Sequence, residues 1–426
     1  MRRRAATLVV CLAIAGCGAN ASDSELTIDV FGPYRDAEAD NFAASLQQFE
    51  DDTGLTVRYT GSADFVTDLR QRVESGISAP DIAIVPQPGV VDDLIAADRI
   101  VPLDDTSVQE LRDNYPAELV EQSTTNGEIF SAPGRESIKS LVWYRPSVFE
   151  EHGWEVPATL DELGTLVEQI AQDESPTAPW CFAMESGSAT GWTATDWVED
   201  LVLRIGGAEV YDEWAAGERR FDDPAVRDAL MTFDELVLGT GRTAGGLRNI
   251  LQTDVTRASG PLFGNDPGCA MYKQASFAES WFPGGTVIGT DVDFFVLPGT
   301  DPSAPTPLVA GGDSLVQFSD DPDVSRLMAY LISPEGSEVW AERGGFYSGS
   351  TTVDLDTYYT DTDRRFAELF RDGRDVRFDA SDLMPSEIGS GLFWREITLW
   401  IAGTTTLDEF VAIMDASYAD ADADPS

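Results

Sequence analysis

The sequence has little basic charge and almost no histidine. Its 426 residues include 28 lysines and arginines against 75 aspartates and glutamates, which gives a formal net charge of −47. This charge argues against nucleic acid as a partner, because no basic excess exists to displace counterions from phosphates. His152 is the only histidine, so any site or mechanism that needs two histidines is excluded. Lysine is also scarce and occurs only at Lys139 and Lys273.

Long hydrophobic runs are absent as well, apart from one near the N-terminus. Residues 5–16 are apolar and follow three arginines, and this stretch is too short for a permanent membrane span. Small residues stand directly before Cys17, a pattern that resembles the lipobox of bacterial lipoproteins. We therefore expect a signal peptide at residues 1–16, lipidation of Cys17 and a tether at residues 17–25. These features predict an extracytoplasmic protein anchored to the cell membrane. The alternative is an ordinary secretory signal that contains a cysteine.

Cysteine is scarce, with four residues in the chain. Cys11 leaves with the predicted signal peptide and Cys17 takes the lipid, which leaves Cys181 and Cys269. In an exported protein, such a pair favours a disulfide over two buried thiols. No closely spaced cysteine pair is present, so we expect no metal site. Nothing in the sequence indicates a cofactor.

The first hundred residues predict alternating strands and helices. Apolar alternation indicates strands, and apolar spacings of three and four indicate helices. This βαβαβα order predicts an α/β fold with a mostly parallel sheet, whose ligands bind at loops that leave the carboxyl ends of the strands. The predicted strands are 26–31, 55–60 and 81–85, the predicted helices end near 54, 75 and 97, and the loops are 32–35, 61–64 and 86–89.

Two enzymatic interpretations were weighed against the residues present. Residues 312–315 spell Gly-Asp-Ser-Leu, the nucleophile block of one esterase class, but no histidine follows Ser314 to act as its base. A glycosidase needs only two carboxylates, and none of the acidic residues is singled out for that role. We therefore predict a protein that is not an enzyme, with an exported glycosidase as an open alternative.

Binding of a sugar needs flat aromatic faces together with planar polar groups in a cleft. Trp192 lies between Gly191 and Thr193, an awkward place for a core residue, and Phe277 with Trp281 could form a second aromatic platform. Core packing is an equal alternative for these aromatic residues. Polar side chains on predicted strand-end loops or turns, which could equally be caps, are Asp64, Gln87, Glu185 and Asp313.

The whole pattern resembles the extracellular solute-binding protein of a bacterial ABC carbohydrate importer. The resemblance is carried by the lipobox and by four internal segments. Its middle part is most similar to the subgroup that serves alpha-glucosides. The segments are APDIAIVPQPG (79–89), KSLVWYRPSVFEEHGWEVPATLDEL (139–163), PWCFAMESGSATGWTATDWVED (179–200) and PLVAGGDSLVQFSDDP (307–322).

The resemblance implies an α/β, two-lobed periplasmic-binding-protein-like (type II) fold with a hinge and an interlobe ligand cleft. Lobe 1 is expected at residues 26–135 plus 306–345, and lobe 2 at residues 136–305 plus 346–420. Residues 421–426 are expected to be a disordered tail. The glycines of residues 344–349 suit a hinge, because glycine absorbs large dihedral changes.

The resemblance also implies a function and a set of ligand-binding residues. We expect a monomer that binds an alpha-glucoside oligosaccharide by hinge closure and delivers it to ABC permease subunits in the membrane. A binding protein for another solute, such as a polyamine, is the other alternative. The residues expected at the ligand are Tyr34, Asp64, Gln87, Lys139, Glu185, Trp192, Gln274, Phe277, Asp313, Tyr347, Arg377 and Trp394.

Overall fold

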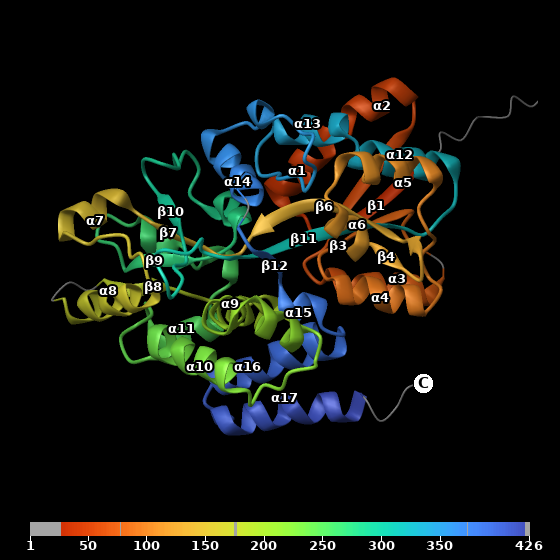
Figure 1. Ribbon diagram of the computed structural model, residues 1–426. Coiled ribbons are helices and arrows are strands. Elements are labelled where there is room, and N and C mark those ends of the chain that lie inside the picture. The colour runs from red at the N-terminus through yellow and green to blue at the C-terminus, as the bar shows by residue number, and fades with distance from the viewer. Residues whose placement is uncertain (1–26, 77, 174–176, 373, 422–426) are drawn as a thin grey trace, which may run out of the picture.

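The computed structural model describes residues 27–76, 78–173, 177–372 and 374–421 (Figure 1). The predicted signal peptide, Cys17 and the tether therefore lie outside the described residues, as does the predicted tail from residue 422 onward. Residue 421, which the prediction assigned to the tail, is the last residue of a helix. None of the helices in the described part of the chain has both the length and the apolar character needed to cross a bilayer.

The first sheet contains six strands in the order β12-β11-β3-β1-β2, with β6 paired to β11. Strand β1 pairs in parallel with β2 and β3, as the alternation predicts, whereas β11 runs antiparallel to β3 and β6. The sheet is therefore mixed, because a strand from late in the chain joins the parallel group. Its strands are β1 (Thr27–Gly32), β2 (Thr56–Gly61), β3 (Ile82–Val85), β6 (Ser131–Ile138), β11 (Leu308–Gln317) and β12 (Val376–Phe378).

Helices around the first sheet bury the apolar faces that the sequence predicts. The helix expected to end at Gly54 does end there, with Gly54 at a φ of 72°, but it is divided in two at Leu46. The helices are α1 (Asp36–Ser45), α2 (Gln47–Thr53), α3 (Phe65–Ser75), α4 (Pro88–Ala96), α5 (Asp105–Asn114), α6 (Ala117–Gln122), α12 (Pro322–Ile332), α13 (Pro334–Ala341) and α14 (Asp361–Arg371), and a small hairpin is formed by β4 (Thr124–Thr125) and β5 (Glu128–Ile129).

The second sheet has four strands in the order β10-β7-β9-β8, and long helices pack beside it (Figure 1). Its strands are β7 (Leu141–Tyr144), β8 (Ala178–Cys181), β9 (Cys269–Lys273) and β10 (Asp293–Val296). Its helices are α7 (Pro146–His152), α8 (Leu160–Gln172), α9 (Trp192–Ala215), α10 (Pro224–Phe233), α11 (Gly246–Gln252), α15 (Ala380–Leu383), α16 (Trp394–Ile401) and α17 (Leu407–Ala421). Short 3-10 or π segments are η1 (Gly187–Ala189), η2 (Asp234–Leu238), η3 (Val255–Arg257), η4 (Gly260–Phe263), η5 (Ser276–Trp281), η6 (Leu355–Thr357) and η7 (Glu387–Phe393).

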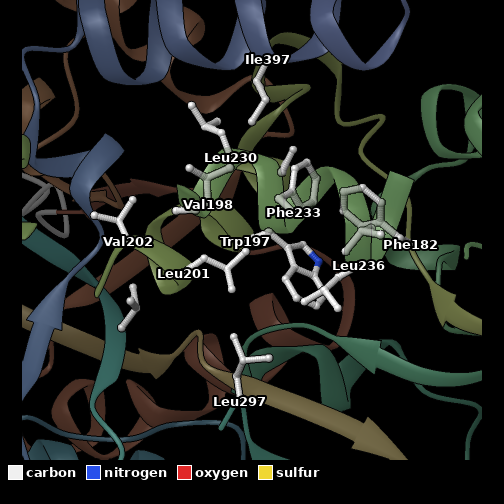
Figure 2. Close-up of a cluster of buried hydrophobic side chains, with 14 of the residues drawn as sticks. Phe182, Trp197, Val198, Leu201, Val202, Leu230, Phe233, Leu236, Leu297 and Ile397 are labelled. Carbon is white, nitrogen blue, oxygen red and sulfur yellow. The ribbon is translucent and has the colours of Figure 1, made fainter. Parts of the chain in front are cut away.

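Helix α9 is the central element of the core on this side of the molecule. Figure 2 shows Trp197, Val198 and Leu201 of this helix among side chains from β10's flank, α10 and α16. Trp197 is 1% exposed and meets Trp180 edge to face, with ring centroids 4.8 Å apart. Buried aromatic pairs of this kind fix helix α9 against the sheet, and so fix the position of Trp192 at its first turn.

The chain crosses between the two sheets more than once, which ties them together. Strand β6 leads directly into β7, and the chain returns from β10 to β11. The predicted lobe boundary at residues 135 and 136 falls inside β6, and β12 belongs to the first sheet although its residues were assigned to lobe 2. The residue bounds of the lobes therefore remain a prediction.

The structure joins Cys181 and Cys269 in a disulfide, as the sequence predicts. The two cysteines lie on the adjacent strands β8 and β9 with their Cα atoms 5.3 Å apart, although 88 residues separate them in the chain. His152 lies in the last turn of α7, as its position before Gly153 indicates. Its ring stacks on Trp154 at a centroid distance of 4.4 Å.

Candidate ligand-binding site

A cavity of about 230 Å³ is lined by elements of both sheets. Tyr34 follows β1 and Gln87 follows β3, so the loops at the carboxyl ends of these parallel strands line the cavity. Seven of the twelve predicted residues line it together: Tyr34, Gln87, Lys139, Trp192, Phe277, Asp313 and Trp394.

A hydrogen-bonded group of charged side chains forms one wall of the cavity. The Tyr34 hydroxyl donates a 2.5 Å hydrogen bond to Asp313, and the Arg135 guanidinium lies 3.5 Å from the same carboxylate. Arg135 also pairs with Glu38 at 2.8 Å and lies over the Tyr34 ring, 4.5 Å from its centroid. Burial raises the pKa of Asp313, and Arg135 opposes that rise. Burial lowers the pKa of Arg135, but the Glu38 carboxylate outweighs it and the net shift is upward. This wall offers charged donors and acceptors held in fixed positions.

Lys139 forms the base of the cavity and belongs to a buried charge network. Its ammonium forms an ion pair with Asp379 and lies 3.2 Å from Asp196 and 3.6 Å from Asp382. Burial by itself would raise the pKa of Asp379, yet Lys139 lowers it to about 2. The lysine therefore serves as the counter-ion of several carboxylates while its ammonium lies 5.7 Å from the centre of the Trp192 ring.

The second lysine, Lys273, has a different position. It is 5% exposed, pairs with Asp200 at 2.9 Å and donates to the Lys139 carbonyl at 3.2 Å. It does not line the cavity. The scarcity of lysine thus marks one residue at the site and one that supports it from behind.

Three buried carboxylates of this network, Asp196, Glu199 and Asp379, have oxygens within 4.8 Å of one another. Such a cluster could hold a metal ion, but Lys139 already pairs with two of them. Glu199 accepts hydrogen bonds from the backbone N–H groups of Ala380 and Ser381. These contacts satisfy the cluster without a metal ion.

Aromatic rings form the opposite wall. Trp192 begins α9, and its ring centroid lies 6.1 Å from that of Phe277, which in turn lies 5.3 Å from that of Trp281. Gly191 holds Trp192 close to Trp394, because a Cβ at residue 191 would lie 2.3 Å from the Trp394 carbonyl oxygen. The side chains of Trp192 and Phe277 are half-buried, and the cavity exposes what the core does not cover.

Five predicted residues do not line this cavity. Gln274 is buried and bonds to the backbone N–H of Ala275 through its amide oxygen. Tyr347 is also buried, and its hydroxyl donates to Glu279 at 2.6 Å. Arg377 lies on β12 and pairs with Asp212 at 2.7 Å. Each of these polar groups already has a partner in the protein, which is a structural role.

The other two lie beside the cavity instead of in it. Asp64 is exposed and accepts a 3.0 Å hydrogen bond from the Ser188 hydroxyl, which links the loop after β2 to η1. Glu185 accepts from the backbone N–H of Gly187 at 3.2 Å. Both therefore order loops at the edge of the site, as their turn-like sequence contexts allow.

The sequence analysis missed four polar residues of the cavity, although one signal could have found two of them. Arg135, Ser137 and Lys139 stand two residues apart, and side chains of a strand alternate between its faces. All three line the cavity. Glu38 in α1 and Asp382 in α15 have no such local signal, because only the packing of distant elements brings them there.

Two α/β sheets, crossing strands and a cavity between aromatic and charged walls define a solute-binding protein with a type II fold. Residues 35–338 match the family described as "Bacterial extracellular solute-binding protein". The chain belongs to this family.

Relatives and solved structures agree with this assignment. The chain is 36% identical over 399 residues to the "Alpha-glucosides-binding periplasmic protein AglE" of Rhizobium meliloti (strain 1021), which covers 92% of this chain and 86% of that protein. It is 34% identical to the "Osmoprotective compounds-binding protein GgtB" of Synechocystis sp. (strain ATCC 27184 / PCC 6803 / Kazusa), covering 93% and 94% of the two chains. Its fold matches maltose-bound MalE3 of T. maritima with a TM-score of 0.73 at 18% identity, over 92% and 99% of the two chains. Because the family and these relatives are binding proteins, the prediction of a binding protein and not an enzyme is confirmed.

Proposed function

We propose that this chain is the substrate-binding component of an ABC importer and that its ligand is an alpha-glucoside oligosaccharide. The similarity to AglE supports the class of ligand. The observation that carries the proposal is the cavity itself, in which the aromatic rings of Trp192 and Phe277 stand opposite Asp313 and Arg135. Sugars present apolar ring faces for stacking and hydroxyls for charged hydrogen bonds, so both walls find partners on one ligand.

Gln87 adds a specific acceptor to this site. Its amide oxygen is buried and has no hydrogen-bond partner within the described residues. An unsatisfied buried oxygen of this kind is costly, and a ligand hydroxyl that donates to it recovers that cost. Gln87 therefore favours a ligand with many hydroxyl groups.

Binding proceeds through closure of the two lobes about the strands that connect them. Tyr34, Gln87 and Asp313 come from the first sheet and its loops, whereas Trp192 and Phe277 come from elements packed with the second. A ligand that contacts both groups binds the closed form better than the open form, and only this difference shifts the equilibrium. The closed form is the one that docks on the permease.

Outside the fold, the function includes a membrane anchor. The signal peptide at residues 1–16 directs export, and Cys17 carries the lipid that holds a monomeric receptor near its permease, where its effective concentration is high. A Cys17→Ala variant expressed in the native host should move from the membrane fraction to the soluble fraction. Equal retention of both proteins at the membrane would contradict the anchor.

Titration calorimetry of the full chain tests the ligand assignment. Maltose, trehalose and sucrose are titrated separately, with spermidine as the polyamine. We expect one-to-one binding of at least one of the three sugars and none of spermidine. A Trp192→Ala variant should lose about tenfold or more in affinity, because stacking contributes about 1 kcal/mol beyond the buried area. Tyr359→Ala is the matched control, since Tyr359 is 70% exposed and outside the cavity. Tight binding of spermidine with no sugar response would overturn the assignment.

A further inference from the structure

A second cavity, of about 250 Å³, lies on the other side of strand β11. It shares Gly312 and Asp313 with the ligand cavity, but its remaining walls come from different elements: α4, α6, β4, β6, β12 and α15. The first cavity contains Arg135 and Lys139, whereas none of the described residues that line the second is a lysine, an arginine or a histidine.

Glu136 is the unusual residue of this second cavity. It is 5% exposed, yet its carboxyl group has no hydrogen bond or ion pair with any of the residues described. Its oxygens occupy space left by two glycines: a Cβ would lie 2.6 Å from them at Gly312 and 3.3 Å at Gly349. Buried carboxylates nearly always have a partner, so a carboxyl that faces a cavity without one indicates a missing ligand.

The rest of the lining indicates the chemistry of that ligand. Asp92 adds a second carboxylate from α4, and Ser131 and Ser314 add hydroxyl groups. The other walls are largely apolar and consist of Val91, Ile95, Leu119, Phe378 and Leu383. A bare metal ion would leave these apolar walls uncovered, whereas an alkylammonium ion has a cationic head for Glu136 and an apolar body for the walls.

We propose that this second cavity binds a small organic cation, an ammonium group on a short apolar body, with Glu136 as its counter-ion. The site is separate from the sugar cavity and does not depend on the identity of the sugar. The two are neighbours through Asp313, whose carboxylate is held by Tyr34 and Arg135 on the sugar side.

The protonation of Glu136 supplies a second readout. Burial, and then the Asp313 charge, raise the pKa of Glu136 to about 8. The other titratable groups nearby are Asp92 across the cavity and Tyr115, whose own pKa burial raises to about 12. At pH 7 the empty site therefore holds a proton on Glu136, and a bound ammonium ion displaces it to solvent. Binding should release close to one proton per cation.

The test is calorimetry of the full chain at pH 7 with n-butylammonium chloride as the probe. Repeating the titration in two buffers of different ionisation enthalpy measures the protons released. We expect saturable one-to-one binding with release of about one proton. Butan-1-ol has the same body without the charge, and sodium chloride has the charge without the body, so neither should bind. Absence of binding by n-butylammonium, or equal binding of sodium, would overturn the proposal.

Variants identify the counter-ion. Glu136→Gln keeps the shape of the side chain and should reduce n-butylammonium affinity by about tenfold or more, with loss of the proton release. Asp92→Asn is the matched control, because Asp92 is an exposed carboxylate of the same lining and should change the affinity less. Binding of maltose, trehalose or sucrose, measured separately, shows whether each variant is folded. Unchanged n-butylammonium affinity in Glu136→Gln would contradict the assignment of this residue, whatever the sugar titrations give.

Discussion

Tyr34 and Asp313 are 279 residues apart in the chain, and the hydroxyl of the first donates a 2.5 Å hydrogen bond to the carboxylate of the second. The bond connects the loop after β1 to the middle of β11, which are parts of one sheet only because a late strand inserts beside β3. Arg135 on β6 completes the group. A large part of the charged wall of the ligand cavity therefore depends on three segments that meet through the sheet.

Arg135 and Arg377 provide a matched pair of arginine variants. Arg135→Gln should weaken sugar binding by about tenfold or more, because it removes a donor from the cavity and leaves Glu38 and Asp313 without their cation. Arg377→Gln should leave the affinity unchanged, because Arg377 pairs with Asp212 away from the cavity. Calorimetric titration of both variants checks this, with thermal unfolding to establish that each is folded. Equal losses in the two variants would show that the cavity is assigned to the wrong place.

Lys139 should matter for stability as well as for binding. Lys139→Met leaves Asp379, Asp196 and Asp382 buried without their shared cation, and removing one partner of a buried ion pair typically costs about 3–5 kcal/mol. Arg58→Met is the control: its pair with Asp29 is exposed, with 64% and 43% of the two side chains accessible, and should contribute less than about 1 kcal/mol. Urea unfolding at pH 7 measures both free energies. A loss in Lys139→Met no larger than in Arg58→Met would contradict the buried network.

The disulfide should contribute to the free energy of unfolding through the loop it closes. Cys181 and Cys269 are 88 residues apart, and the chain-entropy treatment gives about 4–5 kcal/mol for a loop of that length. The double variant Cys181→Ala, Cys269→Ala should therefore unfold at a lower urea concentration. Adding a reductant to the unmodified protein under denaturing conditions should lower its stability toward that of the variant. An unchanged midpoint in the variant would mean that the bond does not form in solution.

The stability of the protein should depend on pH through Glu136. Its pKa rises from 4.5 to about 8 on folding, chiefly because of burial. Between these values the folded state keeps a proton that the unfolded state has released, so the free energy of unfolding falls as the pH rises. This single group contributes a slope of up to about 1.4 kcal/mol per pH unit. Urea unfolding between pH 5 and pH 8 should give a shallower decline for Glu136→Gln, and parallel curves for the two proteins would contradict the shift.

The local elements could be predicted because their signals lie within a few residues. Alternation at residues 26–31 and 81–85 gave β1 and β3 nearly to the residue, and Gly153 and Gly54 marked helix ends. The site was predictable where a side chain sits on a strand-end loop, as Tyr34 and Gln87 do. Predictions failed at Gln274, Tyr347 and Arg377, because a polar residue near the right segment can equally turn toward a partner in the protein.

The sequence by itself determined the family, the α/β alternation and the pairing of Cys181 with Cys269, because each rests on local periodicity, motif order or the elimination of other partners. Only the tertiary structure decided which polar side chains share a cavity. Glu38, Arg135 and Asp382 come from α1, β6 and α15, and nothing local links them. The physical reason is that charged groups are placed by partners distant in sequence: Lys139 is fixed by Asp196 and Asp379, which are 57 and 240 residues away.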